Sequence, residues 1–204
     1  GRFTDQGTAL IQEELIMPQN SSTQLISTRR LCFLALAIIL NIVGGQIALL
    51  LHLPIYLDSM GTILIAVLFG PLYGMLPPLL YGLVMGFTID IYSLYYMPVG
   101  LILGLVTGLA GRSISVKKWR IIPGALLITL PGTIVSSIIT AFLFGGITSS
   151  GSTILVQVLN KAGLGLTASV FVVQFLTDYI DRLISLVFIF YLLSIIPEYL
   201  YREE

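Results

Sequence analysis

The stretch from residue 52 to residue 112 reads HLPIYLDSMGTILIAVLFGPLYGMLPPLLYGLVMGFTIDIYSLYYMPVGLILGLVTGLAGR. It contains three apolar segments, separated by polar turns that are too short to fold by themselves. We predict three membrane crossings here: Gly61–Phe69, a helix over Leu79–Ile89 that extends into the proline-containing turn before it, and a helix over Met97–Gly111. Counting crossings outward from this stretch predicts which polar residues share a side of the membrane.

The composition of the whole chain indicates the same class of protein. Of 204 residues, 56% are hydrophobic and 10% are charged, whereas about a quarter of the residues in an ordinary soluble domain are charged. Ten Lys/Arg balance ten Asp/Glu, so the net charge favours neither nucleic acid nor acidic partners. We therefore predict an all-α integral membrane protein that binds no nucleic acid. Its single cysteine, Cys32, excludes a disulfide within the chain.

Upstream of this stretch, one more crossing is predicted. Leu31–Leu51 carries no charge and spans roughly 31 Å at 1.5 Å per residue. Arg29 and Arg30 precede it, and because basic residues tend to remain cytoplasmic, this end is expected inside. Residues 1–28 form a polar tail. Met17 is a candidate natural start, which would make residues 1–16 an added leader; a short native amphipathic helix is the alternative.

Downstream, the charge of one loop checks the count of crossings. Residues 112–120 (RSISVKKWR) hold four basic residues and no acidic one, and the number of crossings before them also places them inside. Ile121–Phe144, with a kink expected near Pro131, and Leu166–Ile196 complete six transmembrane helices in a single domain over residues 29–204. Both termini are then cytoplasmic, and the outer loops are residues 52–60, 90–97 and 145–166.

Two patterns lie inside the predicted helices. Gly100, Gly104 and Gly108 share one helix face, which predicts the close approach of another helix, within the chain or in a dimer; we favour the first. Asp178 and Arg182 are four residues apart and can pair on one helix, while Asp181 lies on a different face. A structural ion pair and a functional site within the membrane are both open interpretations.

The motifs of common enzymes are missing from the sequence. It contains no HExxH, GxSxG, P-loop or dinucleotide-binding glycine pattern, nor the glycine-flanked aspartate of intramembrane aspartyl proteases. Its one histidine, His52, cannot form a histidine-rich metal site. We therefore predict no catalytic residue, no metal site and no bound cofactor, and expect any uphill transport to take its energy from a partner.

Two pieces of the sequence resemble a known family. These are LDSMGTILIAVLFGPLYGMLPPLLYGLVMGF (Leu57–Phe87) and YYMPVGLILGLVTGLAGR (Tyr95–Arg112). With six crossings, the chain resembles, over Arg29–Tyr201, the substrate-binding S-components of energy-coupling factor (ECF) vitamin transporters, and most of all the cobalamin-type S-components of lactic acid bacteria. The resemblance implies a multi-pass protein of the bacterial plasma membrane. It also implies a vitamin pocket near the outer surface, made by helices 4 to 6 and capped by the first two outer loops.

The same resemblance implies partners. A transmembrane coupling subunit would contact helices 1 to 3, and two cytosolic ATPases would use ATP and Mg²⁺ to topple the S-component and deliver the vitamin inward. The Ala-x-x-x-Ala pattern that the family uses for this contact is absent from helix 1. The candidate contact residues are the small ones on that helix: Ala35, Ala37, Gly44 and Ala48.

Polar and aromatic residues of the outer loops are the candidate substrate-binding residues. They are His52, Tyr56, Asp58, Asp90, Tyr92, Tyr95, Tyr96, Gln157, Asn160 and Lys161. Aromatic rings and hydrogen-bonding groups with one cation suit a large, mostly neutral ligand, so we expect cobalamin or a related corrinoid, with pantothenate, folate and riboflavin as alternatives. For any single tyrosine, an aromatic belt at the lipid headgroups is the competing interpretation. A structural membrane protein of the MreD type and a small channel or facilitator are the competing functions.

Overall fold

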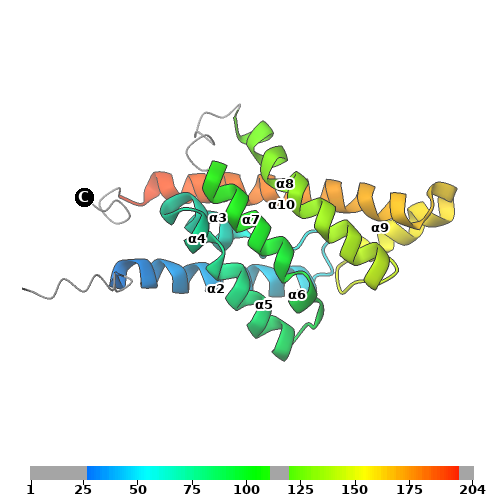
Figure 1. The fold of residues 1–204 in the computed structure, drawn as a ribbon, viewed down its shortest axis with the longest axis horizontal. Coiled ribbons are helices and arrows are strands. Elements are labelled where there is room, and N and C mark those ends of the chain that lie inside the picture. The colour runs from blue at the N-terminus through cyan, green and yellow to red at the C-terminus, as the bar shows by residue number, and fades with distance from the viewer. Residues whose placement is uncertain (1–26, 111–119, 198–204) are drawn as a thin grey trace, which may run out of the picture.

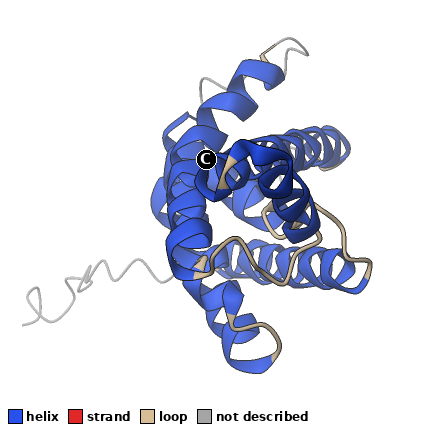
Figure 2. Cartoon of the chain, turned by 90° about the vertical axis from the view of Figure 1, so that its right-hand side faces the viewer, coloured by secondary structure: helices blue, strands red, loops and turns tan. Residues whose placement is uncertain are grey.

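The computed structural model describes residues 27–110 and 120–197. The predicted tail up to residue 26, most of the basic loop at 112–120 and the C-terminal residues 198–204 lie outside these ranges. Every element of regular structure in the described ranges is a helix (Figure 2). The all-helical fold expected from the sequence is thus confirmed for this part of the chain.

Two long helices lie antiparallel along the length of the molecule (Figure 1). They are α2 (Thr28–Leu50) and α10 (Leu166–Ile195). The start of α2 and the end of α10 lie at the same end of the molecule in that view. Between them in sequence come α3 (Met60–Phe69), α4 (Pro71–Gly74), α5 (Leu76–Thr88), α6 (Tyr92–Tyr95), α7 (Met97–Ala110), α8 (Ile121–Ile138), the π-helix η1 (Ile139–Leu143), α9 (Ser152–Leu159) and the π-helix η2 (Asn160–Leu164).

The short helix α3 occupies the centre of the bundle. Its residues from Gly61 to Ala66 are all buried, and it packs against α2, α7 and α10. Ile63 and Leu64 meet core residues of the other helices, such as Leu103 of α7 and Leu186 of α10. A helix that is apolar on every side is stable only when it is surrounded, and its neighbours provide that environment.

The ends of α3 follow from its sequence. Gly70 adopts a φ of 87°, which is open to glycine and costly for other residues, and Pro71 cannot donate a backbone hydrogen bond, so the helix stops there. The predicted break at this turn is confirmed. The next long helix, α5, begins at Leu76 and holds Pro77 and Pro78 in its first turn, so it starts three residues before the predicted Leu79.

A buried amide joins α2 to α3. Asn41 Nδ2 donates to Thr62 Oγ1 at 2.9 Å, and its Oδ1 accepts from the backbone N–H of Gly61 at 2.8 Å. An added Cβ on Gly61 would lie 1.9 Å from the carbonyl oxygen of Ala37, so the two helices touch backbone to backbone here. Both polar ends of Asn41 are satisfied, which offsets the cost of burying an amide.

The outward faces of the long helices are apolar, whereas the interior is partly polar. Leu36, Ile39, Val43 and Ile47 form an exposed apolar stripe on α2, and α8 and α10 carry similar exposed residues. The buried set includes Asn41, Gln174, Asp178, Asp181 and Arg182. This distribution is the reverse of that in an ordinary water-soluble domain, where charged residues lie outside.

In the described ranges, two helical segments have the length and apolar composition needed to cross a membrane, Thr28–Leu50 and Ile121–Leu143. The 30-residue helix α10 is long enough but carries Asp178, Asp181 and Arg182 near its middle. The apolar helices α3, α5 and α7 have 10, 13 and 14 residues, fewer than the roughly 20 of a full crossing. The residues of the six predicted spans therefore lie in helices of unequal length, and the number of crossings stays a prediction.

One local prediction changes. The segment 90–97, predicted as a loop, contains the single-turn helix α6, because the backbone and side chain of Asp90 accept hydrogen bonds from the N–H groups of Ser93 and Tyr92. The predicted fifth helix has Pro131 inside α8 and continues into the π-helical segment Ile139–Leu143.

The glycine face of α7 meets α4 and the start of α5 within the same chain. An added Cβ would lie 2.5 Å from Pro78 Cβ at Gly100, 2.2 Å from the carbonyl oxygen of Gly74 at Gly104, and 2.3 Å from Pro71 Cα at Gly108. Any side chain on this face would push the helices apart. The glycines of α7 therefore make a helix contact within the chain, as we favoured from the sequence.

A pair of glycine substitutions tests this packing. Gly104→Ala should lower the free energy of unfolding by about 1–3 kcal/mol, because the methyl group meets backbone atoms that cannot move aside. Gly132→Ala in α8 is the matched control: its nearest neighbour would be Val99 Cγ1 at 3.4 Å, so the change should be neutral or stabilising by up to about 1 kcal/mol. Thermal unfolding in detergent measures both, and equal unfolding temperatures for the two variants would contradict the packing described.

Candidate functional site

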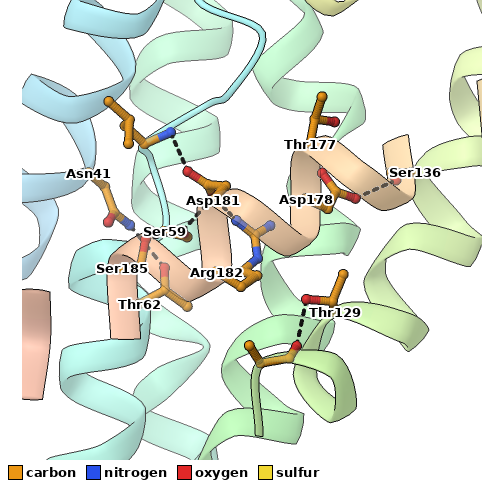
Figure 3. Close-up of polar contacts among 12 residues, drawn as sticks. Asn41, Ser59, Thr62, Thr129, Ser136, Thr177, Asp178, Asp181, Arg182 and Ser185 are labelled. Carbon is orange, nitrogen blue, oxygen red and sulfur yellow. Dashed lines mark hydrogen bonds and ion pairs between the residues drawn. The ribbon is translucent and has the colours of Figure 1, made fainter. Parts of the chain in front are cut away.

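The loop between α2 and α3, residues 51–59, is held against α10 by one carboxylate. The backbone N–H of Leu57 donates to Asp181 Oδ1 at 2.8 Å, and Ser59 Oγ donates to Asp181 Oδ2 at 2.9 Å (Figure 3). Asp181 is completely buried, and Arg182 forms an ion pair with it. A carboxylate with three donors is well satisfied, so the loop has a fixed attachment point in the middle of the bundle.

The same loop has strained backbone. His52 and Leu57 have φ values of 49° and 54°, in the left-handed region that residues with a Cβ rarely adopt. Gly44 of α2 lies directly against the backbone of Leu57. A Cβ added at Gly44 would be 2.0 Å from the Leu57 carbonyl oxygen, so a larger residue would push the loop away. Such conformations persist only where the surroundings determine them. At Leu57 the hydrogen bond to Asp181 and the close contact with α2 do so. His52 follows the last turn of α2, where its own N–H donates to Leu49 and the N–H of Leu53 donates to Ala48.

The ion pair differs from the one predicted. Arg182 pairs with its neighbour Asp181. Asp178 instead accepts hydrogen bonds from two residues of α8, Thr133 Oγ1 at 2.8 Å and Ser136 Oγ at 3.2 Å; Figure 3 draws the contact with Ser136. The prediction of an Asp178–Arg182 pair was therefore wrong. Hydroxyl groups of the adjacent helix hold Asp178, and the long Arg182 side chain reaches the carboxylate that anchors the loop.

A layer of polar side chains continues from Asp178 toward the loops. Tyr56 OH donates to Gln174 Oε1 at 3.4 Å, and Gln174 Nε2 donates to Thr140 Oγ1 at 3.4 Å. Tyr96 OH contacts the same Thr140 hydroxyl. Thr140 lies in η1, and π-helical turns often occur at functional sites because they reorient a side chain.

The other two loops join the first. Ser150 Oγ and the N–H of Gly151 donate to the carbonyl oxygen of Leu53 at 3.4 Å and 3.2 Å. Ser149 Oγ donates to Asp90 Oδ2 at 2.8 Å, which ties the segment after η1 to the segment before α6. Figure 2 looks on to this end of the bundle and shows loops crossing between the helix ends.

These loops and helices line a partly open pocket with a cavity volume of about 90 Å³. The polar wall consists of Tyr56, Asp58, Ser59, Thr62, Tyr81, Asp90, Tyr92, Ser93, Tyr96, Ser136, Thr148, Ser149, Ser150, Gln174, Asp178 and Arg182. Apolar residues such as Leu49, Ile55 and Leu103 complete it, so a ligand would find both apolar surface and several hydrogen-bonding groups.

The structure divides the predicted binding residues into two groups. Tyr56, Asp58, Asp90, Tyr92 and Tyr96 line the pocket. His52, Tyr95, Gln157, Asn160 and Lys161 do not. His52, Tyr95 and Lys161 are exposed, and the ring of Tyr95 packs edge-on against Phe144, with centroids 5.2 Å apart.

The binding residues predicted from the sequence included none from α10, although a functional role for Asp178 and Arg182 was left open. Gln174, Asp178 and Arg182 line the pocket, and they stand four residues apart, so they share one face of the helix. That spacing of three polar residues was the available signal. The hydroxyl groups opposite them on α8 were harder to find, because isolated Ser and Thr residues are common in apolar helices.

The small residues proposed for a coupling contact mostly face inward. Ala37, Gly44 and Ala48 are buried within this chain, and Ala48 lines the pocket. Only Ala35 of the four is exposed. A partner that approached α2 would therefore meet the exposed apolar stripe of that helix rather than these small residues.

The electrostatics of the pocket are dominated by carboxylates. Burial and then the neighbouring carboxylate of Asp181 raise the pKa of Asp58 to about 6, against the opposing effect of Arg182. Burial also raises the pKa of the Tyr56 and Tyr96 phenols, so both remain hydrogen-bond donors at neutral pH. The described residues include no group of three or more His, Cys, Asp or Glu placed to hold a metal ion.

Comparisons of this chain with protein-family models, with curated proteins and with solved structures find no match.

Removing a hydroxyl from the Asp178 site should destabilise the protein. Thr133→Val takes away a hydrogen bond to a carboxylate, at a cost of about 1.5–3 kcal/mol. Thr129→Val, one turn earlier and equally buried, is the matched control, since its hydroxyl donates only to the carbonyl oxygen of Ala125 in its own helix. Thermal unfolding should show a clearly larger loss for Thr133→Val; losses of the same size would mean that Asp178 does not depend on α8.

The raised pKa of Asp58 predicts a pH-dependent stability. The folded chain holds this proton more tightly than the unfolded chain, so its stabilising effect is complete below about pH 4. The effect is lost as the pH rises through about 6. Asp58→Asn keeps the side chain neutral, and the unfolding temperature of the variant minus that of the unsubstituted protein should become more positive from pH 4.5 to 7.5. A difference that stays constant, or falls, would contradict this environment for Asp58.

Proposed function

We propose that this chain is the substrate-capturing subunit of an ECF-type importer, which binds a vitamin-sized molecule in the pocket between α7, α8, α10 and the loops. The observation that carries the proposal is the pocket itself. Segments from all three predicted outer loops meet around it, and buried polar side chains of α8 and α10 form its floor. A pure scaffold has no need of such a cavity.

The position of the pocket agrees with the family resemblance. In S-components, helices 4 to 6 form the vitamin site, and the first two outer loops cap it. In this chain the corresponding helices contribute Val99 and Gly100 of α7, Ser136 of α8 and Gln174 of α10. The loop 51–59 and the segment around α6 provide Tyr56 and Tyr92 from the other side.

The distribution of apolar surface supports a membrane location. The exposed stripes of α2, α8 and α10 have no apolar partner in the described structure, and lipid would cover them. We propose that the shorter helices α3, α5 and α7 complete the six crossings by tilting and by using their connecting turns. In this arrangement both termini are cytoplasmic, and the pocket opens toward the outside.

The size of the pocket bears on the substrate. Its cavity volume is about 90 Å³, so only a small molecule, or one part of a larger one, would fit inside without movement of the loops. A corrinoid, the substrate expected from the sequence resemblance, is much wider and would have to project through the mouth or displace the loops. The geometry therefore favours a smaller vitamin over cobalamin for this pocket.

The driving force would come from partners. The chain has no nucleotide-binding motif, so ATP hydrolysis would be carried out by two cytosolic ATPases joined to it through a coupling subunit. The exposed apolar stripe of α2, with Leu36, Ile39 and Val43, is the surface that we propose for this contact. In lipid such a contact depends on packing rather than on the hydrophobic effect.

Co-purification and uptake test the proposal together. Expressed with an ECF coupling module, the chain should purify with the coupling subunit and both ATPases, and cells should take up one vitamin only when the ATPases are active. Gln174→Ala should abolish uptake without loss of the complex, and Thr129→Val should leave both intact. Uptake with inactive ATPases would indicate a facilitator instead, and folded chain without either uptake or complex would indicate a scaffold.

A further inference from the structure

The wall of the pocket carries more negative than positive charge. Asp58, Asp90 and Asp178 line it, whereas Arg182 is the single Lys or Arg among its lining residues. The charge of Arg182 is already opposed by Asp181, its partner in the buried ion pair. Lys161, the cation that the sequence suggested for this site, is exposed on η2 and lies outside the wall.

Asp178 is the best placed of these acids to meet a ligand. Its side chain is 4% exposed and lines the pocket. Both of its hydrogen bonds, from Thr133 and Ser136, arrive at Oδ2, and among the described residues no donor is recorded for Oδ1. Asp178 Oδ1 does not belong to the fully buried side-chain atoms that lack a partner, so it can accept a hydrogen bond from a group that binds in the pocket.

The positions of Asp58, Asp90 and Asp178 favour an organic cation over a metal ion. In the described ranges they are not grouped closely enough to hold a metal ion. They lie on different elements: Asp58 in the first loop, Asp90 before α6 and Asp178 on α10. Tyr56, Tyr92 and Tyr96 lie among them in the wall, and the faces of aromatic rings attract cations.

We infer that the pocket takes an organic cation, an ammonium or cationic heterocycle on an apolar or aromatic body, with its charge directed at Asp178. The inference rests on the proposed function, because it assigns a charge to the ligand of that same site. It excludes anions of similar size, which would meet three carboxylates. It also predicts that neutral molecules of the same shape bind more weakly, because they leave Asp178 Oδ1 without a partner.

Molecules of matched shape and different charge test this inference. The probes are choline, its neutral isostere dimethylbutanol with carbon in place of nitrogen, the anion dimethylbutanoate, and benzyltrimethylammonium as a larger cation. Each is added to the detergent-purified full chain, and the unfolding temperature is measured over a concentration series. The two cations should raise it in a saturable way, and the neutral and anionic probes should not.

Variants connect the effect to the pocket. Asp178→Asn should weaken cation binding about tenfold or more, since it removes the opposing charge. Asp90→Asn at the rim should weaken it in the same direction and covers the case in which Asp178→Asn fails to fold. Thr129→Val should leave it unchanged. Stabilisation by the anion or the neutral isostere equal to that by the cations would overturn the inference and leave a small-molecule binder.

A negative result with the cations can be distinguished from a wrong proposal for the function. If no cation shifts the unfolding temperature of folded protein, the inference is overturned. ATP-dependent uptake by the assembled complex then decides the proposed function on its own, because that assay does not depend on the charge of the probe.

Discussion

The buried carboxylate of Asp181 is the contact on which the rest of this structure depends. It lies in the middle of the longest helix and accepts hydrogen bonds from Leu57 and Ser59 while it pairs with Arg182. Without it Leu57 would lose the hydrogen bond that helps to hold its backbone at positive φ. Removal of one member of a buried ion pair commonly costs about 3–5 kcal/mol. Here that cost would be accompanied by release of the loop that closes one side of the pocket.

A polar interior inside an apolar exterior explains how the bundle can hold such a site. If lipid surrounds α2, α8 and α10, their outer faces are stable without charged residues. The charged and hydroxyl groups are instead buried inside the bundle, where they form hydrogen bonds and ion pairs with one another. The hydroxyl groups of Thr133 and Ser136 donate hydrogen bonds to Asp178, and the hydroxyl group of Ser59 donates one to Asp181. These polar contacts add to the apolar packing of α8 against α10, where Ile128 and Leu186 belong to one core cluster, and they attach the first loop to α10. The pocket lies where the contacts leave polar groups facing an open space.

Much of the fold could be predicted from the sequence, because helix boundaries follow local signals. Gly70 and Pro71 mark the end of α3, and the glycine stripe of α7 marks a close helix contact. Tyr56 and Asp90 were expected to lie together because the predicted crossings alternate, and both line the pocket. The partner of Arg182 could not be predicted in this way. Spacing within a helix favoured Asp178, but hydroxyl groups from α8 satisfy that residue, and only the packing of two helices brings them there. The lengths of the helices could not be predicted either. The ten-residue helix α3 is stable at the centre of the bundle because other helices surround it, and the sequence alone does not show that packing.

We propose that this pocket captures one small molecule. The most direct measurement is isothermal titration of the detergent-purified chain with a vitamin panel that includes cobalamin, cobinamide, pantothenate, folate and riboflavin together with cationic members. We expect tight one-to-one binding of a single member, lost in Gln174→Ala and retained in Thr129→Val. The absence of binding by every member, in protein shown to be folded, would contradict it and favour a structural role in the membrane.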